Sequence, residues 1–140
     1  MVYLTRRYHF SASHRLHSDA LSDSENTQLY GKCNSPHGHG HNYVLHVTVA
    51  GPVDPSTGMV MDITLLDRVV EEEVVERLDH TFLNLDVENF RHVVPTTENV
   101  CLEIFKLLGD KLGSKVTRGF PRLKKILLEE TQSNYFEYEG

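Results

Sequence analysis

The stretch HGHNYVLHVTVA, residues 39–50, decides the fold of this chain. Its apolar and polar residues alternate, which is the pattern of a β-strand that buries one of its two faces. Residues 2–14 show the same alternation, because single polar residues separate Tyr8, Phe10 and the next apolar residue of this segment. Two strands are therefore predicted, joined by a long loop over the polar residues 16–38.

Two helices are predicted after the second strand. Asp62 is a suitable N-cap, and apolar residues then recur at helical spacing as far as Leu78. Thr97 can cap the second helix, whose apolar stripe stops just before Gly113, a residue that commonly ends helices. Residues 79–95 form the connection between the two helices.

Two further strands are predicted at residues 122–131 and 134–138. The order β-β-α-α-β-β predicts an α+β subunit with an antiparallel sheet and both helices on one of its faces. An open sheet of four strands has two unpaired edges, which neighbouring subunits could cover. We therefore expect an oligomer.

The composition is that of one globular domain, residues 1–140. Hydrophobic residues make up 39% of the chain and charged residues 24%. No apolar run reaches the roughly 20 residues that span a bilayer. No secretory signal is recognisable either, so we expect a cytoplasmic protein without a membrane segment. The 14 basic residues are scattered and outnumbered by 20 acidic ones, which argues against nucleic-acid binding.

Histidine is unusually frequent, with nine in 140 residues. His39 and His41 are two residues apart, so on a strand both imidazoles leave the same face, about 7 Å apart at the backbone. His14, at the end of the other strand, could add a third nitrogen. Three imidazoles and one open position are typical of a catalytic zinc ion, whereas Cys33 as a fourth ligand would make a closed structural site. A histidine-rich loop with adventitious metal affinity is the remaining interpretation.

Three further residues could take part in proton transfer. Cys33 lies in a polar loop, where its thiol could act as a base or nucleophile near a metal ion or could be inert. Asp79 precedes His80 and could set its tautomer, although a histidine is also favourable at any helix C-terminus. The other cysteine, Cys101, lies on an apolar helix stripe and is expected in the core, and neither cysteine is expected in a disulfide.

Two carboxylates are candidates for ligand binding. Glu98 falls in the first turn of the second predicted helix, where capping is a sufficient explanation. Glu130 has the strand parity of the apolar Ile126 and Leu128, and a carboxylate on an apolar face needs a partner. A ligand edge with paired N–H donors, such as that of a pterin or guanine, would satisfy either carboxylate. Otherwise Glu130 turns to solvent at the strand end.

Seven short motifs occur in a consistent order and spacing. They are FSASHRL (10–16), GKCN (31–34), HGHNY (39–43), DPSTGMV (54–60), LDH (78–80), TTENV (96–100) and EET (129–131). Together they resemble the 6-pyruvoyl-tetrahydropterin synthase family, which also contains 6-carboxy-tetrahydropterin synthases, over nearly the whole chain.

The resemblance implies a tunnelling fold. In this fold trimers close a barrel of strands around a central tunnel, two trimers stack into a hexamer, and the active sites lie between subunits. It also implies a phosphorus–oxygen lyase of tetrahydrobiopterin biosynthesis. The substrate would be 7,8-dihydroneopterin triphosphate, and the products 6-pyruvoyl-tetrahydropterin and inorganic triphosphate. One Zn²⁺ per subunit is implied, and Mg²⁺ could accompany the triphosphate.

The matching motifs also imply roles for individual residues. Cys33 resembles the general base that takes a side-chain proton, with Asp79 and His80 of a neighbouring subunit as its partners in a relay. Glu98 resembles the anchor of the pterin ring. The remaining assignments are zinc ligation by His14, His39 and His41, and further pterin contacts from Glu130 and the Thr96-Thr97 backbone. The motifs do not identify the residues that hold the triphosphate, for which Arg15, Lys32, His37 and nearby serines are candidates.

One departure leaves the product open. The position of His37 is usually Asn in the family, and here Cys33 is followed by two possible histidine pairs. The pair His39 and His41 has the spacing of the pyruvoyl enzymes, whereas His37 and His39 have that of the 6-carboxy enzymes of the queuosine pathway. We favour the first pair, because the strand starts directly after it. A 6-carboxy or dual activity is one alternative, and a non-catalytic, zinc-stabilised pterin-binding module is another.

Overall fold

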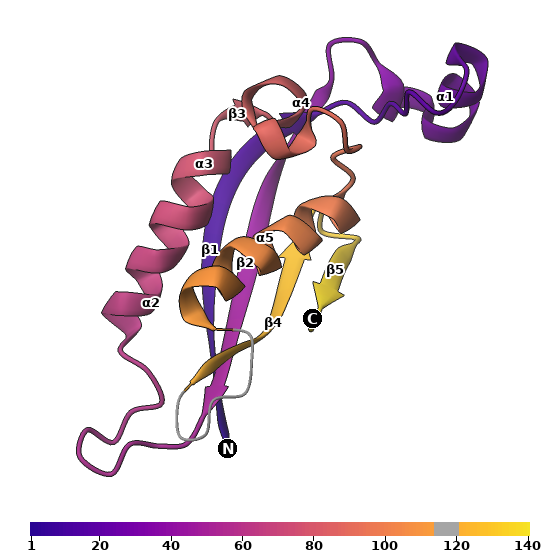
Figure 1. Ribbon diagram of the computed structural model, residues 1–140. Coiled ribbons are helices and arrows are strands. Elements are labelled where there is room, and N and C mark those ends of the chain that lie inside the picture. The colour runs from indigo at the N-terminus through magenta and orange to yellow at the C-terminus, as the bar shows by residue number, and fades with distance from the viewer. Residues whose placement is uncertain (114–120) are drawn as a thin grey trace.

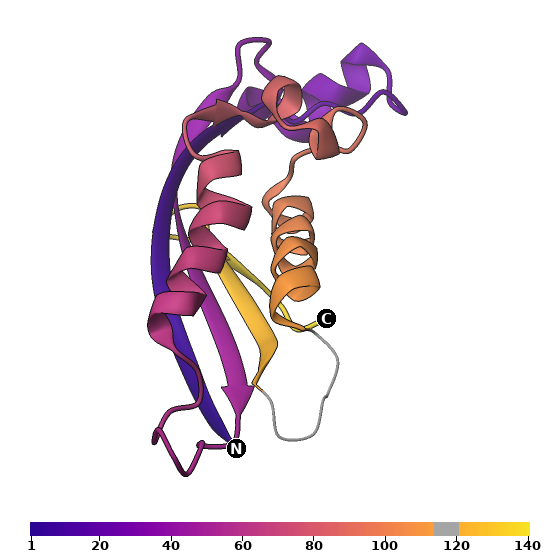
Figure 2. The same cartoon turned by 60° about the vertical axis from the view of Figure 1, so that its left-hand side comes forward.

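The fold is built on two long, paired strands. The computed structural model describes residues 1–113 and 121–140. Strand β1 (Val2–His14) pairs antiparallel with β2 (His39–Gly51) along its whole length. The alternation that predicted these strands is matched by burial, since Tyr43 and Leu45 are fully buried on the helix-covered face. Both strands are strongly curved where Figure 2 shows the sheet on edge.

The complete sheet has five strands in the order β3-β1-β2-β4-β5 (Figure 1). Antiparallel pairing adds β4 (Arg122–Glu129) to β2 and β5 (Tyr135–Tyr138) to β4. The short β3 (Thr81–Phe82) pairs parallel with β1. The predicted all-antiparallel sheet of four strands is thus wrong in one respect, because a two-residue parallel strand extends it.

Two helical rods cover one face of the sheet, as predicted (Figure 2). The first consists of α2 (Ile63–Val70), a widened turn (Glu71–Val75) and α3 (Glu76–Leu78). It starts where expected, with the Asp62 side chain accepting a hydrogen bond from the Thr64 amide.

The second rod is α5 (Thr97–Leu112), and it requires a correction. Its N-cap is Thr96 rather than Thr97, because the Thr96 hydroxyl accepts the hydrogen bond from the Asn99 amide. Thr97 is the first helical residue and is buried. The helix ends at Gly113, whose positive φ of 77° is easy only for glycine.

The core lies between the sheet and the two rods. It is formed by the inward residues of the strands and the apolar stripes of the helices, and its fully buried members include Leu45, Val47, Ile104, Leu108 and Ile126. Each such side chain contributes about 1.5–3 kcal/mol by leaving water. This core holds the strand ends in place, and those ends carry the site.

Both connections contain more structure than the sequence indicated. The predicted loop 16–38 includes α1 (Asp23–Tyr30) and a 3₁₀ turn, η1 (Gly31–Asn34). A capping box between Ser22 and Glu25 starts α1, which projects away from the sheet (Figure 1). Connection 79–95 contains the remaining three elements, β3, α4 (Leu83–Asp86) and η3 (Glu88–Phe90). Within the described ranges, no helix is long and apolar enough to cross a membrane.

Candidate metal centre

The candidate site forms where β1 and β2 end. The strand register places His14 opposite His39, and His41 is two residues further along β2 on the same face. The three imidazoles therefore meet on the helix-covered side of the sheet. Their ring centroids lie 4.7, 5.0 and 4.8 Å apart, and the Nε2 atoms of His14 and His39 are separated by 3.1 Å.

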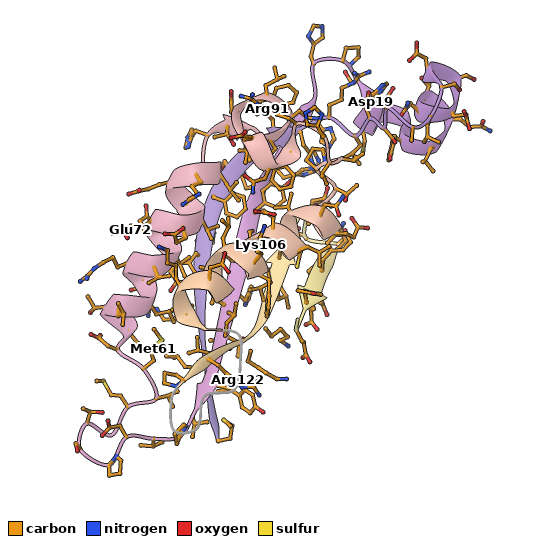
Figure 3. All side chains as sticks on the ribbon, viewed as in Figure 1. Asp19, Met61, Glu72, Arg91, Lys106 and Arg122 are labelled. Carbon is orange, nitrogen blue, oxygen red and sulfur yellow. The ribbon has the colours of Figure 1, made fainter. Side chains whose placement is uncertain are left out.

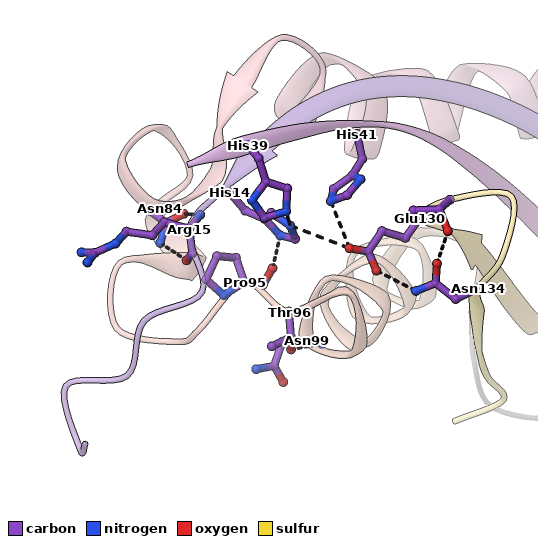
Figure 4. A network of polar contacts seen from close by, with 11 residues as sticks. His14, Arg15, His39, His41, Asn84, Pro95, Thr96, Asn99, Glu130 and Asn134 are labelled. Atoms are coloured by element: carbon purple, nitrogen blue, oxygen red, sulfur yellow. Dashed lines mark hydrogen bonds and ion pairs between the residues drawn. The ribbon is translucent and has the colours of Figure 1, made fainter. Parts of the chain in front are cut away.

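A carboxylate completes the group. Glu130 directly follows β4, and its Oε1 lies 3.0 Å from Nε2 of His41 and 3.9 Å from Nε2 of His14 (Figure 4). One ligand atom from each of the four residues lies within 4.8 Å of the others, so this group could hold a metal ion. Asn134 donates to the other oxygen of Glu130 at 3.0 Å and fixes its orientation.

The chemistry of the donor set fits zinc. Nδ1 of His14 donates to the Pro95 carbonyl at 2.7 Å, so Nε2 carries the lone pair that faces the cluster. Burial lowers the pKa of His14, which has no exposed surface, and also lowers the pKa of His41, against the opposing effect of Glu130. Both imidazoles are therefore neutral at neutral pH, as a metal ligand must be. Zinc accepts both imidazole nitrogen and carboxylate oxygen.

Tyr43 packs against the histidine cluster, and it was not among the site residues predicted from the sequence. Its ring stacks on Phe10 with centroids 4.9 Å apart, and it meets the edges of His14 and His41 at 6.5 and 5.6 Å. Burial raises the pKa of its hydroxyl. Strand parity could have identified Tyr43 as a site residue, because it lies two residues after His41 and therefore shares the face of β2 that carries His39 and His41.

Cys33 is close to the cluster residues in sequence, but it does not belong to the cluster in space. It is half-buried in η1, and its carbonyl accepts a hydrogen bond from the Leu16 amide, two residues after His14. Within the described residues, the group of possible ligands contains Glu130 and does not contain Cys33. His37 is exposed and also lies outside the group. The geometry therefore favours the pair His39 and His41 over His37 and His39.

Asp79 and His80 form a pair on the surface. Oδ2 of Asp79 lies 2.9 Å from Nδ1 of His80, and Oδ1 accepts from the Ser11 amide at 2.8 Å. These hydrogen bonds, that from Ser11 first, lower the pKa of Asp79. His80 has a φ of 58° and an 83% exposed side chain. It lines an open groove of about 520 Å³ together with His41.

The predicted pterin contacts lie near the N-terminus of α5. Thr96 and Asn99 appear beneath the histidines in Figure 4. Glu98 is exposed in the first turn of the helix, whereas Glu130 lies inside the cluster. The structure therefore brings His14, His39, His41 and Glu130 together, and it leaves Cys33 and the Asp79–His80 pair separate from them within one subunit.

Fold and site together define an α+β protein with a candidate metal centre at the end of its two longest strands. The family model for 6-pyruvoyl tetrahydropterin synthase matches residues 3–140. The human 6-pyruvoyl tetrahydrobiopterin synthase is 48% identical over 137 residues, covering 98% of this chain and 90% of that protein. The chain therefore belongs to the 6-pyruvoyl tetrahydropterin synthase family.

A solved structure and a more distant relative extend the comparison. The Caenorhabditis elegans 6-pyruvoyl tetrahydropterin synthase superposes with a TM-score of 0.91 at 43% identity, covering 99% of this chain and 95% of that one. This match confirms the fold class that the motifs predicted. A putative 6-carboxy-5,6,7,8-tetrahydropterin synthase from Archaeoglobus fulgidus is 41% identical over 101 residues, covering 72% of this chain and 79% of that protein.

Proposed function

We propose that the chain is a zinc-dependent lyase that converts 7,8-dihydroneopterin triphosphate to 6-pyruvoyl-tetrahydropterin and inorganic triphosphate, in tetrahydrobiopterin biosynthesis. The observation that carries this proposal is the group of three imidazoles and one carboxylate within 4.8 Å of one another. It occurs in a chain that is 48% identical to the human synthase. In the proposal His14, His39 and His41 hold one Zn²⁺ per subunit and leave a coordination position open. Mg²⁺ accompanies the triphosphate.

The bound metal supplies Lewis acidity, which makes the C–H bonds beside the substrate's side-chain hydroxyls more acidic. Cys33 then acts as the base that takes up the proton. Asp79 is fixed by the Ser11 amide and orients His80, which faces solvent in the single subunit. This exposure supports the assignment of the pair to the active site of a neighbouring subunit, where His80 shuttles the proton.

The pterin ring is assigned to two carboxylates, Glu98 in the first turn of α5 and Glu130 in the cluster. Glu98 anchors the ring, and Glu130 and the Thr96-Thr97 backbone add further contacts. A carboxylate accepts two parallel N–H bonds from such a ring, which fixes its orientation as well as its position. Fixing the ring brings the reacting side chain to the histidines.

The sheet edges support the proposed assembly. Within the described residues, β3 pairs with β1 only at Ala12 and Ser13, so most of the outer edge of β1 is free. At the opposite edge, β5 pairs on one side only. Edges of this kind are suited to strand pairing between subunits. The single domain 1–140 then forms trimers with a closed barrel, and two trimers stack into a hexamer.

Both cysteines are free thiols, which supports action in the reducing cytoplasm. A 6-carboxy product or a dual activity is favoured less, because His37 is exposed and outside the cluster. A non-catalytic pterin-binding module is the alternative from another class, and it differs in predicting no turnover.

A product assay tests the proposal. The zinc-loaded protein is incubated with 7,8-dihydroneopterin triphosphate without a reductase, and the pterin is identified by mass spectrometry. A 6-pyruvoyl product with released triphosphate is expected. A 6-carboxy product would instead identify the chain as an enzyme of the queuosine-type reaction. Absence of turnover, with zinc and pterin bound, would support the non-catalytic binding module.

A further inference from the structure

A pocket of about 470 Å³ lies directly beside the histidine cluster. Arg15, which follows His14 in the chain, lines this pocket, as does Pro95, whose carbonyl accepts the hydrogen bond from His14. Further lining residues come from η3 and the segment between it and Pro95, including Arg91. The pocket therefore shares two wall residues with the surroundings of a candidate metal ligand.

The pocket is rich in basic side chains. Arg15, His17, Arg91 and His92 all line it, against a single carboxylate, that of Asp19. Across the described residues, Arg15 and Arg91 form no ion pair with any carboxylate. The protein as a whole is acidic, with a net charge of −6, so two unpaired guanidinium groups in one pocket stand out from its surface. Arginine without a carboxylate partner is suited to bind phosphate.

Arg15 is held in place by two asparagines. The Asn84 side chain accepts from the Arg15 amide and donates to the Arg15 carbonyl, both at 2.8 Å (Figure 4). Nε of Arg15 donates to the Asn34 carbonyl at 3.0 Å. The buried Asn34 also donates to Nδ1 of His17 at 2.9 Å. These contacts fix the backbone of Arg15 and the Nε of its guanidinium group, whereas its Nη groups make no hydrogen bond within the described residues.

The pocket and Glu130 lie on opposite sides of the histidines. Figure 4 shows Arg15 and Asn84 on one side, the imidazoles in the middle, and Glu130 with Asn134 on the other. Arg91 lies at the same end of the molecule, over α4 (Figure 3). The proposed substrate has a matching order, because its reacting side chain lies between the pterin ring and the triphosphate. A ring beside Glu130 and a side chain at the histidines direct the triphosphate towards Arg15.

We propose that this pocket, with Arg15 and Arg91 as its main cationic contacts, binds the polyphosphate group of the substrate. The polyphosphate identity rests on the proposed function, whereas the anion site rests on the pocket itself. Of the basic triphosphate candidates from the sequence, Arg15 lines the pocket, whereas Lys32 and His37 do not. Arg91, His17 and His92 are the residues that the motifs did not indicate.

The test measures binding of inorganic triphosphate by calorimetry, without any turnover. Arg91→Ala and Arg15→Gln are each expected to weaken binding about tenfold, because each removes a charge-assisted contact. Arg68→Ala, on the exposed surface of α2, removes the same charge elsewhere and should leave the affinity unchanged. In His39→Ala the affinity should persist, which separates the pocket from direct chelation by the metal. Higher ionic strength should weaken binding.

Two outcomes would overturn the inference: an affinity that neither arginine variant changes, or an affinity that disappears in His39→Ala. Because Arg15 is bonded into the strand end, Arg91→Ala serves as the variant that does not disturb β1. If the enzyme turns over the triphosphate with unchanged KM in both arginine variants, the pocket assignment fails while the proposed function stands. If arginine-dependent triphosphate binding occurs without turnover, the anion site stands and the proposed function fails.

Discussion

The Nε2 atoms of His14 and His39 lie 3.1 Å apart because the two residues face each other at the end of the β1–β2 ladder. Nδ1 of His14 already donates to the Pro95 carbonyl, so its Nε2 can only accept or ligate in the neutral form. The Pro95 carbonyl therefore fixes the orientation of the His14 ring towards His39. The ladder thus places two candidate ligands side by side.

Metal content should therefore depend on the pair His39 and His41. We expect His39→Ala to weaken zinc binding by about a hundredfold or more, because it removes one of few protein ligands. His37→Asn is the matched control, since His37 is exposed and outside the cluster. Metal analysis after gel filtration would measure both. Loss of zinc in His37→Asn would select the other histidine register, because His37 and not His41 would then be the partner of His39.

Cys33 should be needed for turnover and dispensable for metal binding. We expect Cys33→Ala to keep its zinc and to lose about a hundredfold or more in kcat, the usual contribution of a general base. Cys101→Ala is the control, because Cys101 is buried on α5, where its thiol faces the Phe136 carbonyl of β5, and should affect mainly stability. Parallel zinc analysis and steady-state kinetics would check this. Loss of zinc in Cys33→Ala would instead make Cys33 a ligand.

Glu130 has two possible roles, which one substitution can separate. The motifs assign it to the pterin ring, whereas the structure places its Oε1 3.0 Å from His41. We expect Glu130→Gln to retain zinc, because three imidazoles suffice, and to raise KM about tenfold through a lost charge-assisted contact. Glu129→Gln, which affects the neighbouring pair with His46, is the control. A fall in zinc affinity with unchanged KM would identify Glu130 as a ligand.

The sequence predicted which histidines lie together better than it predicted the connections. His39, His41 and Tyr43 could be grouped because strand parity fixes which side chains share a face. His14 could be proposed as a third ligand because it lies at the end of the other predicted strand, but its place opposite His39 depends on the register between two distant strands. Glu130 could be assigned to the apolar face of its strand from the alternation of residues. Its distance to His41, however, depends on where β4 ends, which the sequence pattern does not define.

The connections escaped prediction for a different reason. The α1 sequence DSENTQLY has no apolar stripe, and its only buried residue is Asn26, which bonds the Ser18 backbone. Such a helix depends on capping rather than on hydrophobic periodicity. The two-residue β3 is shorter than any alternating pattern can reveal. The role of Asn84 depends on a contact between residues 69 positions apart, which no local pattern contains.

Asn84 should matter for both stability and anion binding. Asn84→Ala leaves the amide and carbonyl of Arg15 without their partner, so we expect a loss of about 1–3 kcal/mol in unfolding free energy. We also expect weaker binding of inorganic triphosphate. Asn89→Ala is the matched control, because Asn89 is exposed and, within the described residues, its side chain hydrogen-bonds only to the Glu103 carboxylate. Denaturant unfolding and calorimetry would measure both effects. Equal behaviour of the two variants would contradict the role of Asn84.

The contact between β1 and α2 should give a defined pH dependence. Asp67 accepts hydrogen bonds from Arg6 at 2.8 and 3.0 Å and from Tyr8 at 2.8 Å, and these bonds lower its pKa below the ordinary value of 3.8. The unfolded chain therefore takes up the proton first. The stabilisation is present above the ordinary pKa and disappears as the pH falls through it towards the folded value.

We therefore expect Asp67→Asn to unfold at lower denaturant concentration than the wild type at pH 6, and the difference to shrink as the pH approaches 3. The effect should be small and should decrease with salt, because both side chains are about 40% exposed. Asp62→Asn is the control, since asparagine also caps helices and Asp62 accepts only from a backbone amide. A stability difference for Asp67→Asn that grows at low pH would contradict the direction of the pKa shift.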